Sequence, residues 1–246
     1  MIPKKIHYCW VGGNPLPEKD RKCIESWRRA CPDWEIVRWD ETNYDFHKKA
    51  YMGQAYDAGK WGFVPDYARL DIVSSEGGIY LDTDVELLRS PDQLLDYSGY
   101  MGWSQDGFAN PGLGFGAEAG NATLKHLMAA YDRLSFVNED GSLNLTASPH
   151  YATDSLAELG FSKRSEVQII DGFAVLPSDY LDPLNPDTGR LEKTENTLSA
   201  HLYFGSWLSD RDRYQKELRR NFNKKGIPDS LAWPLSRGVA YLKHEG

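Results

Sequence analysis

The sequence has few cysteines, no excess of basic residues and no long apolar run. Its three cysteines include no Cys-x-x-Cys pair, which suits a reducing compartment and gives no sign of a thiolate metal site. The net charge of -8 makes nucleic acid an unexpected partner. No apolar stretch reaches the length of a membrane span, and the first residues lack the apolar region of a signal peptide. We therefore expect a cytoplasmic protein, at most peripheral at the inner face of a membrane.

The composition is that of a globular protein. The chain has 246 residues, of which 41% are hydrophobic and 26% charged, so it is long enough to bury a core. Aromatic residues reach 13%, and they either fill that core or offer flat surfaces to sugars and bases.

The first ninety residues predict an α/β fold. Residues 6–11 and 34–39 read as strands, and apolar residues recur at helical spacing through 18–31 between them. This order is the start of a βαβ unit with a parallel sheet. A helix over 64–76 ends at Gly77-Gly78 and leads directly into an apolar strand over 79–85. Further along, we expect a helix at 124–134, strands at 167–170 and 173–176, and a loop or hairpin at 182–196.

Two carboxylates in the predicted strand 79–85 form an Asp-x-Asp motif. Asp82 and Asp84 are one residue apart, and strand alternation places them on one side together with Tyr80. Adjacent carboxylates repel each other unless a cation lies between them, and Mg²⁺ or Mn²⁺ suits such oxygen ligands. The same cation can neutralise a pyrophosphate, which explains how an acidic protein could hold a nucleotide diphosphate. By itself the motif is weak, because surface aspartates are common.

The preceding helix adds an acid and a guanidinium to this unit. Asp66 and Arg69 are three residues apart and therefore share one helix face. They either contact a ligand near the Asp-x-Asp motif or form a salt bridge within the helix, and the pattern leaves both readings open.

Taken together, these motifs resemble the DXD-containing sugar-transferase family. The resemblance is carried by residues 2–13, by Asp66-x-x-Arg69 and by residues 77–84, and it resumes over residues 199–207. That family includes yeast initiating α-mannosyltransferases, bacterial capsular-polysaccharide transferases and, more distantly, large glucosylating bacterial toxins.

The resemblance implies a fold and an activity. The fold is α/β of the GT-A type, a Rossmann-like mixed sheet flanked by helices. The activity is transfer of a hexose, with retention of anomeric configuration, from a nucleotide sugar (a UDP-sugar is favoured, GDP-mannose is the other candidate). The acceptor is a saccharide or lipid-linked oligosaccharide in polysaccharide, capsule or glycoconjugate biosynthesis. The cofactor is Mn²⁺ or Mg²⁺.

The resemblance also assigns roles to individual residues. The metal ligands are Asp82, Asp84 and His201, the last of which is closer to retaining galactosyltransferases than to the toxins. Residues at the reaction centre are Asp66, Arg69, Asp82 and Asn110, with Gln105 and Asp106 as further candidates. Contacts to the nucleotide sugar come from Trp10, Asp66, Arg69, Tyr80, Asp82, Thr83, Ser206 and Trp207. Trp10 and Trp207 have ordinary alternatives as core and anchoring residues.

The C-terminal part changes in composition. We expect a catalytic domain over 1–210 and a helical extension over 211–246 packed on it. Residues 211–225 have a net charge of +5, with Tyr214, Leu218 and Phe222 on one stripe. This basic segment is either a solvated helix face or a peripheral membrane contact.

Two other functions share parts of the pattern. A phosphatase of the haloacid dehalogenase type also places Asp-x-Asp after an apolar strand, although Glu86 stands where that motif has Thr or Val. A non-catalytic sugar-binding protein is the second alternative.

Overall fold

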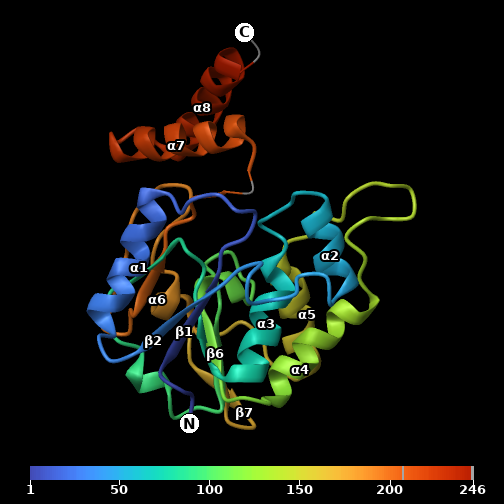
Figure 1. Cartoon of the computed structure of the whole chain (residues 1–246). Coiled ribbons are helices and arrows are strands. Elements are labelled where there is room, and N and C mark those ends of the chain that lie inside the picture. The colour runs from blue at the N-terminus through green and yellow to red at the C-terminus, as the bar shows by residue number, and fades with distance from the viewer. Residues whose placement is uncertain (207, 245–246) are drawn as a thin grey trace.

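A seven-stranded mixed sheet forms the centre of the protein (Figure 1). The computed structural model describes residues 1–206 and 208–244. The strand order is β2-β1-β3-β6-β5-β8-β7. The bounds are β1 Lys5–Cys9, β2 Glu35–Trp39, β3 Gly78–Tyr80, β5 Gly99–Gly102, β6 Phe115–Ala117, β7 Gln168–Ile170 and β8 Phe173–Leu176.

Strand direction changes in the middle of this sheet. β1 runs parallel to β2 and β3, as the βαβ reading predicts, with Ile6 opposite Ile36 and Ile79. β6 is antiparallel to both β3 and β5, and β5 pairs in parallel with β8. The expected strands at 167–170 and 173–176 are present as β7 and β8, which pair antiparallel across Asp171-Gly172.

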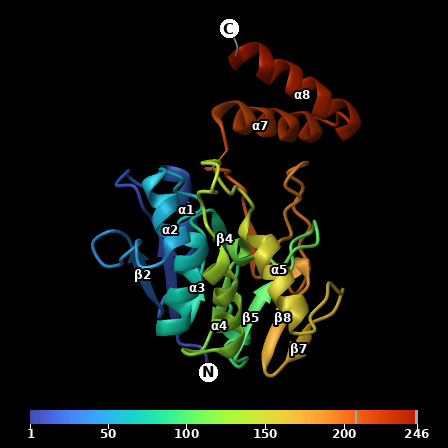
Figure 2. The ribbon, with the colours of Figure 1, turned by 90° about the vertical axis from the view of Figure 1, so that its right-hand side faces the viewer.

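Helices cover both faces of the sheet, as the two views show (Figures 1 and 2). Their bounds are α1 Glu18–Ala30, α2 Ala50–Asp57, α3 Pro65–Glu76, α4 Ala122–Ala129, α5 Ser148–Glu158 and α6 Ser178–Leu181, with 3-10 turns η1 Asp92–Leu94, η2 Pro111–Leu113 and η3 Ala130–Arg133. Neighbouring strand residues enter two different apolar clusters: Ile79 packs with Trp27 of α1, and Tyr80 packs with Leu70 of α3. The sheet is therefore buried on both faces, as expected of an α/β fold.

The predicted continuous strand over 79–85 is wrong. β3 ends at Tyr80, and a separate strand β4, Val85–Leu87, begins only after the Asp-x-Asp motif. The backbone N–H of Val85 donates to the carbonyl of Asp82 at 3.0 Å, so residues 82–85 form a turn. β4 leaves the main sheet and pairs antiparallel with β9, Ser199–His201, in a separate two-stranded ribbon.

The C-terminal residues form a helical hairpin that stands apart from the sheet, on the side opposite the N-terminus (Figures 1 and 2). Its helices are α7, Asp210–Lys224, and α8, Asp229–His244. α8 buries the small side chains of Ala232, Ser236 and Ala240, which recur every four residues and so form one stripe. The boundary between a catalytic domain and this extension, at residue 210, stays a prediction. No helix in the described residues is long and apolar enough to cross a membrane.

Candidate metal and donor site

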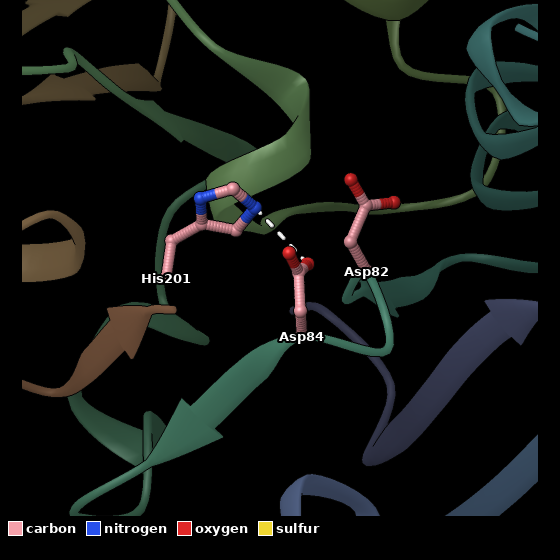
Figure 3. Close-up of side chains that lie close together, drawn as sticks. All are labelled: Asp82, Asp84 and His201. Atoms are coloured by element: carbon pink, nitrogen blue, oxygen red, sulfur yellow. Dashed lines mark ion pairs between the residues drawn. The ribbon is translucent and has the colours of Figure 1, made fainter. Parts of the chain in front are cut away.

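Asp82, Asp84 and His201 converge at the turn between β3 and β4 (Figure 3). One ligand atom from each residue lies within 4.8 Å of the other two. The Nε2 atom of His201 is 3.0 Å from the Oδ1 atom of Asp84. The cluster predicted from the sequence therefore exists, but a turn and not strand alternation brings the two carboxylates together.

The pairing of β4 with β9 brings His201 to the motif. Val85 and His201 are partners in this ribbon, so His201 lies beside the end of the Asp-x-Asp turn. Asp84 then holds the chain after β9: its carbonyl accepts from the N–H of Leu202 at 2.8 Å, and its Oδ2 atom accepts from the N–H of Phe204 at 3.0 Å. Asp84 thus organises the segment that carries the third ligand.

The charges of Asp84 and His201 stabilise each other. Burial acts to raise the pKa of Asp84, but the facing imidazole and the Phe204 N–H outweigh it, and the pKa is lowered. Burial likewise acts to lower the pKa of His201, and the neighbouring Asp84 raises it instead. Asp82 behaves differently: burial raises its pKa, opposed by Arg69. The site therefore concentrates carboxylate charge in a partly buried place, which favours a cation.

The donor set fits a hard divalent cation. Two carboxylates and one imidazole suit Mn²⁺ or Mg²⁺, with Mn²⁺ more tolerant of the nitrogen ligand. His201 and Asp84 lie 3.0 Å apart as a direct ion pair, so His201 would bind a cation only as a neutral imidazole that has given up this contact.

Arg69 links the Asp-x-Asp motif to helix α3. Its guanidinium pairs with Asp66 and reaches the Oδ2 atom of Asp82 at 3.3 Å. Arg69 and Asp66 are each only 4% exposed. Burial raises the pKa of Asp66 to about 6, against the opposing effect of Arg69. The salt bridge within the helix is therefore present, and it extends to the motif, so the two readings of this pair are compatible.

Asn110 and Gly112 close the site on the side of Asp82. Asn110 caps η2 by accepting from the N–H of Gly112 at 2.8 Å. A Cβ atom placed on Gly112 would lie 2.8 Å from the Oδ2 atom of Asp82 and 3.1 Å from the Oδ1 atom of Asn110. The predicted residues Asn110, Asp82 and Arg69 therefore meet around one glycine.

Three other predicted donor contacts have different surroundings. Tyr80 is buried in the core, and its ring makes a cation–π contact with the Arg69 guanidinium, which lies 5.6 Å from the ring centre. The hydroxyl of Thr83 donates to Asp20 of α1 at 2.7 Å, which turns this side chain toward α1. Trp10 directly follows β1, is partly exposed, and donates from its indole N–H to the carbonyl of Asn14 at 2.6 Å.

The remaining predicted residues lie in two loops. Ser206 is exposed in the segment between β9 and α7, and Trp207 lies outside the described residues. Gln105 and Asp106 lie in the loop after β5, where the side-chain amide of Gln105 donates to the carbonyl of Asp182 at 2.8 Å.

Asp182 and Tyr203 support the site without being predicted from the sequence. Asp182 is buried, accepts from the N–H of Gln105 at 3.0 Å, and accepts from the hydroxyl of Tyr203 at 2.8 Å. The Tyr203 ring in turn packs edge-on against His201, with 4.1 Å between ring centres. Tyr203 has a φ of 54°, a conformation that is uncommon outside glycine. A lone aspartate in a polar loop gives no sequence signal, so only the fold reveals this connection.

Comparison with known proteins agrees with the site. Residues 17–100 match the family described as the glycosyltransferase sugar-binding region containing a DXD motif. This stretch is similar to the DXD-type sugar-binding region of glycosyltransferases. The resemblance to the DXD-containing sugar-transferase family, predicted from the sequence, is confirmed.

Two curated relatives cover less than half of the chain. Inositol phosphoceramide mannosyltransferase 3 of Schizosaccharomyces pombe is 33% identical over 127 residues, covering 46% of this chain and 33% of that protein. Subversion of eukaryotic traffic protein A of Legionella pneumophila is 27% identical over 135 residues, covering 43% of this chain and 21% of that protein. The matched regions thus span about a third or less of these relatives.

A solved structure supports the fold. The PaToxG glycosyltransferase superposes with a TM-score of 0.51 at 21% identity, over 64% of this chain and 70% of that one. Together with the mixed sheet flanked by helices, this confirms the predicted α/β fold of the GT-A type.

Proposed function

We propose that this protein is a metal-dependent, retaining glycosyltransferase that moves a hexose from a nucleotide sugar to a saccharide acceptor. The observation that carries the proposal is the cluster of Asp82, Asp84 and His201 within a confirmed DXD-type region. The three side chains would hold Mn²⁺ or Mg²⁺, which when bound would ligate the diphosphate and offset part of the charge that grows on the leaving group.

The residues around the cluster have separate tasks in this proposal. Arg69 offers the planar face of its guanidinium beside Asp82, where it would bind donor oxygens. Asp66 holds Arg69 in position through a buried ion pair, and its carboxylate balances the guanidinium charge. Asn110 and the sugar-facing loop after β5 would position the transferred sugar, with Gln105 and Asp106 as the candidates nearest to it. Trp10, Thr83 and Ser206 would line the nucleotide part of the donor.

The donor and the acceptor of the proposed reaction belong to known chemical classes. A UDP-sugar remains the favoured donor, and the mannosyltransferase name of the Schizosaccharomyces pombe relative adds support for GDP-mannose. The acceptor is a saccharide or a glycolipid, including lipid-linked oligosaccharides of the kind that polysaccharide and capsule synthesis uses. This relative is also named for a lipid acceptor, inositol phosphoceramide.

A screen of purified protein against UDP- and GDP-sugars, with Mn²⁺ or with EDTA, tests the proposal. We expect donor hydrolysis with at least one sugar in Mn²⁺ and none in EDTA. Asp84→Asn removes a metal-binding charge with little change of shape, so it should abolish this activity while circular dichroism shows that the protein is still folded. Full turnover in EDTA would contradict the metal-dependent proposal.

The same screen separates the two alternatives. Metal-dependent release of phosphate from a phosphomonoester, without cleavage of any nucleotide sugar, would favour the haloacid dehalogenase reading. Saccharide binding without nucleotide binding or turnover would favour a non-catalytic sugar-binding protein.

Peripheral membrane contact at the cytoplasmic face is a further part of the proposal. The predicted segment 211–225 is basic, but the large apolar side chains exposed nearby lie on α8, including Leu231, Leu235 and Leu242. These three recur at helical spacing beside the basic helix, which suits an anionic lipid surface. Leu235→Ser combined with Leu242→Ser should reduce sedimentation with phosphatidylserine vesicles, and unchanged sedimentation would argue against this contact.

A further inference from the structure

Helix α7 places two basic side chains next to the candidate metal site. Arg220 donates from Nη1 to the carbonyl of Leu202 at 3.2 Å, and Leu202 itself donates its N–H to the carbonyl of Asp84. The ammonium of Lys216 lies 5.1 Å from the centre of the Tyr203 ring, the same ring that packs against His201. The helix is therefore joined to the chain that holds the metal ligands, one residue away from them.

These two cations form no ion pair within the described residues, although the negative charges of Asp187 and Asp84 act on both. Lys216 is partly buried and forms no ion pair or hydrogen bond there, only the contact with the Tyr203 ring. Arg220 donates to the carbonyls of Pro186 and Leu202, which carry no net charge, and its Nη2 atom is buried without a partner. Burial, together with the positive charge of Arg220, lowers the pKa of Lys216 to about 8. Partly buried cations without a direct ion pair are costly, so this arrangement favours an anionic ligand.

The other arginines of α7 form ion pairs of their own, and Lys224 is exposed. Arg219 pairs with Asp187 at 2.6 Å and with Asp229 at 2.5 Å, and Arg213 pairs with Asp210 at 2.6 Å. Lys216 and Arg220, one turn apart on the face toward the sheet domain, therefore differ from the rest of the basic helix.

The charges of the proposed site leave room for these two cations. A divalent cation balances Asp82 and Asp84, and Arg69 is balanced by Asp66. The diphosphate of a nucleotide sugar carries about two negative charges, which increase as the leaving group departs. Two further positive charges are needed near the diphosphate to balance it. Helix α7 places Lys216 and Arg220 beside the segment that follows β9, next to the candidate metal site.

We propose that α7 forms part of the donor site, with Lys216 binding the diphosphate and Arg220 fixing the Leu202 backbone and adding its positive field. This inference rests on the proposed function and adds the C-terminal hairpin to the donor-binding machinery. Helix α7 would then supply positive charge for the diphosphate of the nucleotide in an otherwise acidic protein, in addition to any contact with a lipid surface.

Calorimetric titration with UDP and with GDP, each in Mn²⁺, tests the proposal on the full chain. Lys216→Met keeps the length and the packing on Tyr203 but removes the charge. We expect it to weaken binding of whichever nucleoside diphosphate the wild-type protein binds by at least about tenfold, because the charged hydrogen bond from the ammonium to the diphosphate is lost. Lys216→Arg should recover most of this loss. Lys225→Met, an exposed lysine directly after α7, is the matched control and should bind like wild type.

A second comparison assigns the effect to the diphosphate. Binding of the matching nucleoside without phosphates, and of Mn²⁺ alone, should be unchanged in Lys216→Met. Equal nucleoside diphosphate affinity in Lys216→Met and Lys225→Met would overturn the role of Lys216 while the proposed function stands. If the wild-type protein binds neither UDP nor GDP in Mn²⁺, the proposed function itself fails, and this inference fails with it.

Discussion

Gly112→Ala should damage the candidate site while leaving the fold intact. The backbone of Gly112 is not in the left-handed region, so alanine is compatible with its conformation. The new methyl group would start 2.8 Å from the Oδ2 atom of Asp82, whereas ordinary contact begins near 3.4 Å. Asp82 must therefore retreat by about 0.6 Å. It is also held by Arg69, 3.3 Å away, so the movement changes both the metal-binding carboxylate and the guanidinium beside it.

The expected cost is roughly tenfold or more in turnover, because a misplacement of about 1 Å at a reacting centre can cost about a hundredfold. Stability should change little, since the methyl group displaces the end of a side chain and no backbone. Donor hydrolysis in Mn²⁺ and thermal unfolding measure the two effects. Gly238→Ala, where no atom lies within 4 Å of the added Cβ, is the matched control. Wild-type turnover in Gly112→Ala would show that the position of Asp82 does not matter to the reaction.

Three further predictions address the charges and supports of the site. Arg69→Met leaves Asp66 buried without its partner and should cost about 3–5 kcal/mol in the free energy of unfolding, measured by urea titration. Adding Asp66→Asn should restore part of this stability. Additive losses in the double variant would show that Arg69 and Asp66 are not energetically coupled. Asp84→Asn should weaken Mn²⁺ binding at least about tenfold by calorimetry, because it removes a ligand charge; unchanged affinity would exclude Asp84 as a ligand. Thr83→Val removes the hydrogen bond to Asp20 and should lower stability by about 1 kcal/mol, and if turnover falls without any loss of stability, Thr83 acts on the donor instead.

The local order of strands and helices was predictable because it follows from short-range patterns. The β1-α1-β2 unit and the helix ending at Gly77 lie where apolar spacing and glycine predict them. The break after Tyr80 was not predictable, because Leu81 and Val85 continue the apolar pattern while the Asp82–Val85 hydrogen bond turns the chain. The apolar pattern of the sequence reports only on side chains. The turn depends on backbone contacts, namely the Asp82–Val85 hydrogen bond and the pairing of β4 with β9.

The site divides in a similar way. Asp66, Arg69, Asp82 and Asp84 are close in sequence, so helix spacing and adjacency already indicated a shared location. His201 came from family resemblance, since no local pattern links it to a motif more than a hundred residues earlier. Lys216 in its setting beside Tyr203 could not be foreseen, because a basic helix gives the same pattern whether its charges face solvent or a ligand.

The pairing of β4 with β9 has a consequence for how the protein matures. Contacts between segments so far apart in sequence form late and slow folding, because a long loop must close before they contribute. During synthesis the Asp-x-Asp turn emerges well before Ser199–His201, its partner strand and source of the third ligand. Until that strand docks, the two aspartates have only an incomplete set of ligands to offer. The chain would therefore gain the proposed cation-binding centre in one late step, and a nascent or C-terminally shortened chain would lack it even with the motif intact.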